Sequence, residues 1–453
     1  MSVIRMPEYV WTQVYQHLFS GHGEHFAFLL AEPSHSAREP IFIVKDMVCI
    51  PERYTKLGHG GWSVTPEGYL LAINAAVKAD LALIEAHNHG GTRPRFSLTD
   101  RQGLDEFVPY IFDSLPARPY AATVWGDTTI YGEFFTSEDA TGPVRSITAI
   151  GGQFRQLVSR DDDQHAVDVS FDRQLPWFTE QGQQLLGRVR VAVVGAGGTG
   201  SQLVQQLAYL GVREFVIIED DSADQTSMNR LVTATAADVG TPKAVLARRL
   251  IRRVALEAIV TIIASKVQSQ AALDALKGVD VIFGCVDNDG ARLILNELSR
   301  AYRVPYFDVA VGIEVDTTVV IAGGRVAAVT PDGPCLHCMK EIDKREAYFF
   351  LSDQKEQQFQ LERGYVHGLN VSAPSVVSLN ASAAAMAVNE FAIFFSGLRP
   401  ITYYSELDLL GVGRATKGQW TSPRRDSADP TCVVCALAGS GDRATVDRYA
   451  KAG

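Results

Sequence analysis

The stretch VRVAVVGAGGTGSQLVQQLAYLG, residues 189–211, decides the fold of the C-terminal half of this chain. It begins with a short apolar run typical of a buried strand, passes through a glycine-rich turn at residues 195–201, and ends in an amphipathic helical pattern. Glycines in such a turn let backbone N–H groups at the helix N-terminus approach a phosphate. The pattern predicts a Rossmann-like nucleotide-binding unit and does not by itself say which chemistry follows.

Charged residues around this unit are spaced in a way that suits a nucleoside triphosphate. Three acidic residues end the next apolar run, VIIEDD, and two cations and another strand-terminal aspartate follow. Such cations and carboxylates favour ATP with Mg²⁺ over a nicotinamide. An NAD-dependent oxidoreductase is the alternative from another class, and it would show no ATP–pyrophosphate exchange. The charged residues are Arg173, Glu219, Asp221, Arg230, Lys243 and Asp287.

The glycine loop and these charges resemble the ThiF/MoeB/HesA superfamily, which has the fold of ubiquitin-activating enzymes. The resemblance covers about residues 168–438 and implies an ATP-dependent adenylyltransferase. It implies that Glu219 and Asp221 contribute to nucleotide binding, although aspartate is usual where Glu219 stands. It also implies that Arg230 and Lys243 offset phosphate charge. The loop positions in the resemblance are Gly195, Gly197, Gly198 and Gly200.

Two further positions of the resemblance concern Mg²⁺ and a second subunit. Asp287 follows the apolar run in FGCVDND and matches the magnesium position of the superfamily. Arg173 matches an arginine that reaches ATP from the partner subunit. The resemblance therefore implies that this chain forms a homodimer.

Four of the six cysteines form two Cys-x-x-Cys pairs, in GPCLHC and DPTCVVC. Two separated pairs of thiolates favour a closed, tetrahedral, structural Zn²⁺ site, with redox chemistry as the alternative. The superfamily resemblance implies the same, because many bacterial members carry such a zinc clip. The predicted ligands are Cys335, Cys338, Cys432 and Cys435.

The crossover segment of the superfamily, residues 341–377 here, contains no cysteine. Members that pass an activated protein on as a thioester keep their cysteine in this segment. A hydroxyl of Tyr365 or Ser372 would need an activating base, so an ester in its place is disfavoured. We therefore expect the acyl-adenylate to pass directly to an acceptor cysteine of a conjugating partner.

A second motif, AHNHGGTRPRFSLTD, lies at residues 86–100. It follows a strand-like run, so His87 and His89 are expected on the same side of the strand, where two imidazoles can bind Zn²⁺. Asp100 can supply a third ligand, and Ser97 would then lie beside the open position. The alternative is a polar loop followed by an ordinary helix cap over residues 97–100.

The spacing His-x-His, seven residues, Ser, two residues, Asp resembles the JAMM (JAB/MPN) zinc metalloproteases over about residues 10–150. That family cleaves bonds after the C-terminal glycine of ubiquitin-like proteins. The resemblance implies catalytic Zn²⁺ bound by the two histidines and Asp100, with Ser97 stabilising the oxyanion. This sequence departs from the family pattern at Asn88 and at residues 90–91.

The family also requires a glutamate at the start of an upstream strand as general acid and base. Glu24, in GEHFAFLLA, is the preferred candidate, although Ala27 replaces the usual glycine. Glu32, at the far end of the same apolar run, is the competitor. The choice rests on hydrogen-bond reach to a zinc-bound water.

Length and composition set the frame for both motifs. A chain of 453 residues suggests two domains, and we predict them at residues 1–157 and 169–453, joined by an acidic linker at 158–168. The net charge of −10 and the lack of a basic block disfavour nucleic acid and anionic membranes as partners. With no secretory signal in its N-terminal stretch, the chain is expected in the cytoplasm.

Together the motifs predict an α/β fold, a JAMM-type domain followed by a Rossmann-like adenylation domain with a zinc clip. The expected enzyme is an ATP-dependent adenylyltransferase fused to a zinc isopeptidase or peptidase. Its expected substrate is a ubiquitin-like protein, trimmed or released after its C-terminal glycine and adenylated there. Activation of a sulfur carrier for small-molecule biosynthesis is the alternative, and a non-catalytic scaffold is a third possibility.

Overall fold

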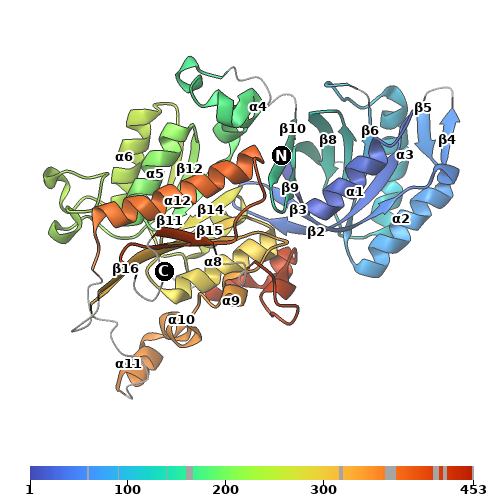
Figure 1. The fold of residues 1–453 in the computed structure, drawn as a ribbon. Coiled ribbons are helices and arrows are strands. Elements are labelled where there is room, and N and C mark those ends of the chain that lie inside the picture. Colours follow the sequence, from blue (N-terminus) through green and yellow to red (C-terminus); the bar gives the residue numbers. More distant parts are fainter. Residues whose placement is uncertain are drawn as a thin grey trace. The chain divides into compact units, whose positions relative to one another are not determined.

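The computed structural model describes residues 1–58, 61–89, 91–138, 140–159, 167–315, 320–362, 374–411, 418–421 and 426–450. The chain divides into two compact units, which Figure 1 colours along the sequence. Unit 1 comprises Met1–His165 together with Gly439–Ala444, and unit 2 comprises Ala166–Ala438 together with Thr445–Gly453. The short segment Gly439–Ala444 thus groups with the N-terminal unit although it follows the second cysteine pair.

Unit 1 is built on strands that close into a barrel in the order β1-β3-β2-β6-β7-β8-β10-β9. The barrel strands are β1 (Ser2–Pro7), β2 (Phe26–His35), β3 (Pro40–Cys49), β6 (Ala82–Asn88), β7 (Tyr120–Trp125), β8 (Thr129–Phe135), β9 (Thr141–Ile150) and β10 (Phe154–Ser159). The helices are α1 (Glu8–Leu18), α2 (Pro66–Ala79) and α3 (Leu98–Ser114), and β4 (Thr55–Gly58) pairs with β5 (Gly61–Val64) as a separate hairpin.

Side chains that alternate along the strands of unit 1 pack into two separate hydrophobic clusters. Leu29 and Ile84 belong to the cluster that contains the buried face of α1. Phe28, Leu30 and Leu83 belong to the cluster formed with α2 and α3. Because neighbouring residues of a strand point to opposite faces, β2 and β6 are buried on both sides. That burial explains the apolar runs at residues 26–31 of β2 and 82–84 of β6.

The pairing of β2 with β6 brings the two predicted parts of the histidine site together. These strands are antiparallel, and Phe26 at the start of β2 pairs with His87 near the end of β6. Glu24 lies just before β2, so it is held beside the two histidines. Helix α3 begins at Leu98, which places Ser97 and Asp100 in its first turn.

Unit 2 contains an eight-stranded sheet in the order β13-β12-β11-β14-β15-β16-β17-β18. Its strands are β11 (Arg190–Val194), β12 (Glu214–Ile218), β13 (Ile259–Ile263), β14 (Val281–Gly284), β15 (Tyr306–Val315), β16 (Val320–Val329), β17 (Tyr404–Asp408) and β18 (Gly418–Thr421). The five strands from β13 to β15 in this order are parallel, and the remaining pairs are antiparallel. This arrangement confirms the predicted mixed α/β fold with a Rossmann-like unit.

The strand order of this sheet reverses direction between β11 and β14. From β11 the chain first adds β12 and β13 on one side and then returns to add β14 on the other. Ligands of open α/β sheets bind in the crevice outside the carboxyl ends of the strands at such a switch point. The glycine loop follows β11 and Asp287 follows β14, so both lie at this edge.

The helices of unit 2 pack against its sheet, and some of them carry residues that hold the sites of this unit in place. They are α4 (Leu175–Arg188), α5 (Gly198–Leu210), α6 (Lys243–Val254), α7 (Gln270–Lys277), α8 (Asp289–Tyr302), α9 (Leu336–Met339), α10 (Lys344–Leu351), α11 (Gln354–Glu362) and α12 (Val377–Ser396). Among the described residues, α12 is the one helix long and apolar enough to cross a membrane by length and composition. It packs against α4, α5, β15 and β16, as a core helix does (Figure 1).

Candidate functional site

The glycine loop of unit 2 has a backbone that only glycine accommodates at two positions. Gly195 has a φ of +89°, and a Cβ there would lie 2.5 Å from the carbonyl oxygen of Cys285. A Cβ on Gly200 would lie 1.9 Å from the carbonyl oxygen of Gly195. A Cβ on Gly197, by contrast, would meet no atom within 4 Å. The loop is therefore packed against its own backbone on one side and open beside the N-terminus of α5, where a phosphate can approach.

Arg230 and a residue of α12 lie against this loop. A Cβ on Gly198 would come 2.4 Å from Nδ2 of Asn380 and 3.2 Å from Cδ of Arg230. The Thr199 hydroxyl donates a hydrogen bond to Oδ1 of Asn380 at 3.2 Å. Nη1 of Arg230 donates to the carbonyl oxygen of Thr226 at 2.6 Å. The structure thus places the predicted cation at the loop and adds Asn380, which the sequence analysis missed.

The predicted ribose and phosphate residues form a connected group beside the loop. The carboxylate of Glu219 accepts hydrogen bonds from the N–H of Ala196 at 2.7 Å and from the N–H of Asp221 at 2.9 Å. Burial raises the pKa of Glu219, and these two N–H groups act in the opposite direction. Nζ of Lys243 pairs with Oδ2 of Asp221 at 2.8 Å. Hydrogen bonds thus connect Glu219 to the glycine loop, and the ion pair with Asp221 holds Lys243 close to Glu219.

Asp287 is exposed at the carboxyl edge of the sheet, directly after β14. Its loop is held by Arg292, whose Nη2 donates to the carbonyl oxygen of Val286 at 3.1 Å and whose Nη1 donates to Asp289 at 2.5 Å. Nε of Arg292 lies 3.5 Å from the fully buried carboxylate of Asp308. This anchoring was missed because it depends on contacts across the sheet edge.

Arg173 is exposed in the turn between the 3₁₀ helix Val169–Phe171 and α4. The resemblance assigns it to the nucleotide site of a partner subunit. A single chain does not test that assignment, so this role stays a prediction.

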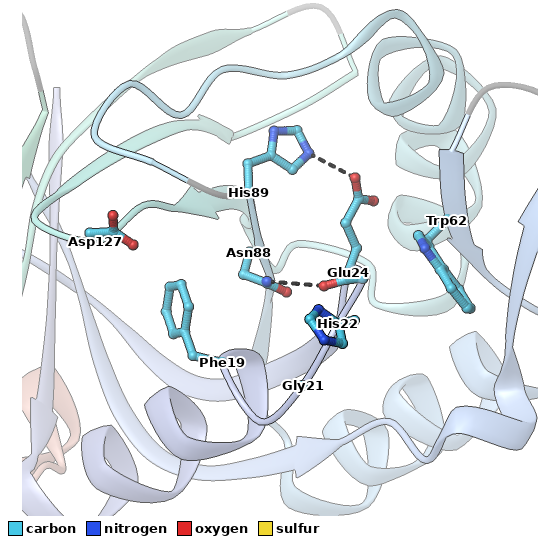
Figure 2. Close-up of a pocket in the computed structure, with 9 residues that line it drawn as sticks. Phe19, Gly21, His22, Glu24, Trp62, Asn88, His89 and Asp127 are labelled. Carbon is cyan, nitrogen blue, oxygen red and sulfur yellow. Dashed lines mark hydrogen bonds and ion pairs between the residues drawn. The ribbon is translucent and has the colours of Figure 1, made fainter.

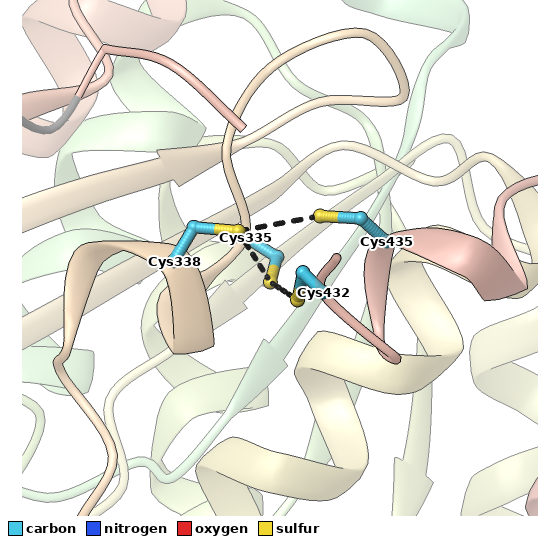
Figure 3. Close-up of side chains that lie close together, drawn as sticks. All are labelled: Cys335, Cys338, Cys432 and Cys435. Carbon is cyan, nitrogen blue, oxygen red and sulfur yellow. Dashed lines mark hydrogen bonds between the residues drawn. The ribbon is translucent and has the colours of Figure 1, made fainter. Parts of the chain in front are cut away.

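The four predicted zinc-clip thiolates converge in unit 2 (Figure 3). Sγ of Cys335 lies 3.7 Å from that of Cys338 and 3.6 Å from that of Cys432, and the Cys338–Cys435 distance is 3.5 Å. These distances exceed a disulfide bond, for which sulfur atoms are about 2 Å apart. A tetrahedral site with Zn–S bonds of about 2.3 Å requires sulfur separations of roughly 3.8 Å, so the arrangement fits structural Zn²⁺.

Helix α8 holds the first pair of cysteines in place. Oδ1 of Asn296 accepts a hydrogen bond from the N–H of Leu336 at 2.9 Å. Nη1 of Arg300 donates to the carbonyl oxygens of Thr330 at 2.5 Å and Gly333 at 3.0 Å. These bonds fix the approach to Cys335 from a buried helix of the core. The clip therefore connects the chain around residues 426–438 to α8.

We expect Cys435→Ser to remove one bound zinc per chain. It should also lower the free energy of unfolding of unit 2 by several kcal/mol, because metal binding and folding are coupled in such sites. Metal analysis and differential scanning calorimetry check this. Cys49→Ser is the matched control, since Cys49 is a lone half-buried cysteine in unit 1. A Cys435→Ser chain with unchanged zinc content would contradict the assignment.

The sequence profile of the ThiF family matches residues 171–434, which is more than half of the chain. This chain belongs to the ThiF family. The matched range contains the glycine loop, the charged residues around it, the first cysteine pair and Cys432, and it ends one residue before Cys435.

Curated relatives resemble parts of this ThiF-family chain. The SAMP-activating enzyme E1 of Haloferax volcanii is 33% identical over 159 residues, which cover 35% of this chain and 56% of that protein. The sulfur carrier protein adenylyltransferase of Thermus thermophilus is 35% identical over 125 residues, covering 27% of this chain and 45% of that protein. The chain thus spans about half the length of these two relatives. A solved structure of E. coli MccB is 17% identical, with a TM-score of 0.47 over 59% of this chain and 75% of MccB.

The histidine motif of this ThiF-family chain lies in unit 1, outside the matched range. Nε2 of His87 lies 3.6 Å from Oδ1 of Asp100, and Nε2 of His89 lies 3.5 Å from Oδ2 of the same carboxylate. The three predicted ligands come within 4.8 Å of one another. Tetrahedral Zn–N and Zn–O bonds of about 2.0–2.1 Å require ligand separations of roughly 3.4 Å. The spacing of these atoms therefore fits Zn²⁺.

In the described part of unit 1, the two imidazoles lack hydrogen-bond partners at Nε2, which also suits a Zn²⁺ site. Nε2 of His87 and Nε2 of His89 are buried and make no hydrogen bond to any residue that the structure describes. Buried polar atoms without partners are rare in proteins and call for an explanation. A metal ion bound by Asp100 and by both Nε2 atoms would give these nitrogens a partner. Partial burial acts to raise the pKa of Asp100, but the nearby imidazole of His87 and the hydrogen bonds with Ser97 outweigh it and hold this pKa at about 2, so the carboxylate is ionised at neutral pH.

The helix-cap alternative for Ser97 and Asp100 is also realised. Oγ of Ser97 accepts a hydrogen bond from the N–H of Asp100 at 3.1 Å, and Oδ2 of Asp100 accepts one from the N–H of Ser97 at 2.6 Å. This is a capping box at the start of α3. The capping bonds hold the carboxylate of Asp100 so that it faces the two histidines. Asp100 can therefore cap α3 and serve as a metal ligand in the same conformation.

The structure separates the two candidates for the general base. Oε1 of Glu24 lies 3.5 Å from Nε2 of His89 (Figure 2). Burial raises the pKa of Glu24, as suits a group that exchanges a proton. Glu32 instead pairs with Nε of Arg443 at 2.7 Å. The geometry therefore favours Glu24 as the residue beside the predicted metal.

Asn88, the residue between the two histidines, holds Glu24 from both sides. Its Oδ1 accepts a hydrogen bond from the N–H of His25 at 2.7 Å, and its Nδ2 donates one to the carbonyl oxygen of Gly23 at 3.3 Å. The departure from the family pattern at Asn88 thus has a local structural role. Of the second departure, residues 90–91, Gly90 lies outside the described residues.

A cavity of about 520 Å³ opens beside this cluster. Its lining includes Glu24, His89, Trp62, Phe19 and Asp127 (Figure 2). Trp62 comes from the β4–β5 hairpin and packs over Gly23, whose φ of +100° and 3.0 Å clearance to the indole leave no room for a side chain. The cavity therefore opens onto Glu24 and His89, beside the predicted metal ligands.

Proposed function

We propose that unit 2 adenylates the C-terminal glycine of a small sulfur-carrier or ubiquitin-like protein. The observation that carries this proposal is the convergence of the glycine loop, Arg230, Lys243 and Asp287 at the switch point of the sheet. Membership of the ThiF family supports it, as do the names of the curated relatives. In the reaction a carboxylate oxygen of the glycine attacks the α-phosphorus of ATP, and the bond to pyrophosphate breaks.

Each residue of the site has a distinct task in this proposal. The N-terminus of α5 and the loop glycines bind phosphate, and Glu219 accepts hydrogen bonds from the ribose. Arg230 and Lys243 offset charge as pyrophosphate leaves. Lys243 would exchange its pairing with Asp221 for the nucleotide. Asp287 would hold Mg²⁺, which neutralises the phosphates when it is bound.

Sulfur-carrier activation is our first choice over conjugation of a ubiquitin-like protein. The relatives include a sulfur carrier protein adenylyltransferase and a ThiS adenylyltransferase, the latter from Escherichia coli. The crossover segment of this chain, residues 341–377, contains no cysteine for a thioester. Direct transfer of the acyl group from the adenylate to an external thiol or sulfur donor, with release of AMP, fits both facts. Tyr365 and Ser372, the alternative nucleophiles, lie outside the described residues.

The test is ATP–pyrophosphate exchange by the full chain with a candidate carrier that ends in glycine. Exchange should require both Mg²⁺ and the carrier, and it should vanish when the terminal glycine is deleted. Formation of a thiocarboxylate on the carrier would distinguish sulfur transfer from conjugation. NAD binding without any exchange would favour the oxidoreductase alternative instead.

A second function is proposed for unit 1, because His87, His89, Asp100 and Glu24 form a separate site with its own cavity. We propose that it cleaves the bond after the same glycine, either in a precursor or in a conjugate. Zinc bound there would polarise the scissile carbonyl and acidify a water. Glu24 would take the proton and return it to the leaving amine, and the Ser97 hydroxyl would donate to the oxyanion.

The two proposed activities act on one chemical group. Cleavage after the glycine exposes the carboxylate that adenylation requires. A cytoplasmic homodimer, with Arg173 acting across its subunit boundary, and a conjugating partner with an acceptor cysteine complete the proposal.

A further inference from the structure

Glu85 is a buried carboxylate that neither proposed activity uses. It lies on β6 two residues before His87, so both side chains point to the same side of the strand. Its Oε2 accepts a hydrogen bond from the hydroxyl of Tyr120 at 2.9 Å. Burying an ionised carboxylate costs free energy unless it is paired, so we expect Glu85 to have a partner besides the one hydroxyl.

The remaining oxygen of Glu85 faces the imidazole of His87. Oε1 of Glu85 lies 3.8 Å from Nδ1 of His87. That nitrogen is buried and makes no hydrogen bond to any described residue. The opposite nitrogen, Nε2, faces Asp100 at 3.6 Å. The ring is therefore placed between a metal-binding carboxylate on one side and a second carboxylate on the other.

A histidine that binds a metal through Nε2 carries its proton on Nδ1. Proteins usually supply an acceptor for that proton, which fixes the tautomer and the orientation of the ring. Loss of such an acceptor typically costs 10–100-fold in metal affinity. Within the described part of unit 1, Glu85 is the carboxylate that lies on the Nδ1 side of His87.

We propose that Glu85, held by Tyr120, is a positioning residue that accepts the Nδ1 proton of His87 and orients the ring for Zn²⁺. This inference rests on the proposed metal site of unit 1. The present 3.8 Å separation exceeds a hydrogen bond. A structure of the zinc-loaded protein should therefore show these two atoms within about 3 Å.

The test is zinc affinity of the full chain, measured by competition with a chromophoric chelator. Glu85→Met removes the acceptor and should weaken zinc binding at the histidine site by about 10–100-fold. Glu85→Gln keeps an acceptor oxygen without the charge and should lose less, and Tyr120→Phe should also lose less. The four-cysteine site in the same chain is an internal control whose affinity should not change.

Glu39→Gln is the matched control variant, because Glu39 is a buried carboxylate of unit 1 that pairs with Arg145 at 3.0 Å. Wild-type chain that binds zinc only at the cysteines would overturn the proposed metal site itself. Two zinc ions in the wild type with unchanged affinity in Glu85→Met would overturn the role of Glu85 alone. If Glu85→Met fails to fold, the zinc affinities of Glu85→Gln and Tyr120→Phe test the role of Glu85 instead. Wild-type zinc affinity in both variants would overturn that role.

Discussion

Asp287→Ala is expected to lower carrier-dependent ATP–pyrophosphate exchange by about 10²–10³-fold, the usual cost of removing one group that stabilises transition-state charge. Asp287 is exposed at the switch point of the sheet, where its carboxylate can hold Mg²⁺ against the phosphates. Its loop is anchored through Val286 by Arg292, so the substitution should leave the fold intact.

The matched control is Glu257→Ala. Glu257 is exposed and pairs with Arg213 at 2.8 Å, near the amino ends of β12 and β13 and thus at the opposite edge of the sheet. This variant should keep wild-type exchange. Full exchange by Asp287→Ala with unchanged Mg²⁺ dependence would remove Asp287 from the site.

Glu24→Gln is expected to lower ATP-independent cleavage after the carrier glycine by about 10²–10⁴-fold, the range for loss of a general acid and base. The amide keeps the shape of the side chain but cannot take a proton. Because Glu24 is not among the three predicted ligands, the variant should still bind zinc at the histidine site. Intact-mass analysis of a carrier precursor and metal analysis of the variant check both parts.

Glu32→Gln is the control for this prediction, since Glu32 is buried on β2 and pairs with Arg443. It should cleave at the wild-type rate. The reverse result, with cleavage lost in Glu32→Gln and kept in Glu24→Gln, would show that the wrong glutamate was chosen. Loss of zinc in Glu24→Gln would instead make Glu24 a ligand.

Local sequence patterns predicted those parts of the protein in which spacing and geometry are directly linked. A strand, a glycine turn and a helix within residues 189–211 predict the nucleotide loop, and the structure shows why Gly195 and Gly200 are required there. Cys-x-x-Cys turns predicted the converging thiolates in the same way. The site roles of the charged residues remain proposals that the geometry supports.

Other features were not predictable because they depend on residues far apart in the sequence. Asn380 reaches the glycine loop from α12, and Tyr120 reaches Glu85 from the neighbouring strand β7. Arg443 engages Glu32 from a segment near the end of the chain. Polar side chains of this kind are usually solvated, and only the fold shows that these ones are paired.

The motif at residues 97–100 shows a different limit of sequence reasoning. A helix cap and a metal site both require a serine followed by an aspartate at this spacing. The pattern cannot separate the two interpretations. The structure shows the cap bonds and the approach of Asp100 to both histidines together.

The most direct test of the central proposal is the intact mass of a candidate carrier after incubation with the full chain, with and without Mg²⁺ and ATP. A suitable candidate is any small sulfur-carrier or ubiquitin-like protein in which a short extension follows the glycine that becomes C-terminal after cleavage. We predict loss of the extension without ATP, which Glu24→Gln should abolish and Asp287→Ala should keep. With ATP the trimmed carrier should gain one AMP, which Asp287→Ala should abolish, whereas Glu24→Gln should still adenylate a carrier that is supplied without the extension. A processed carrier whose mass never increases with Mg²⁺ and ATP would contradict adenylation by unit 2.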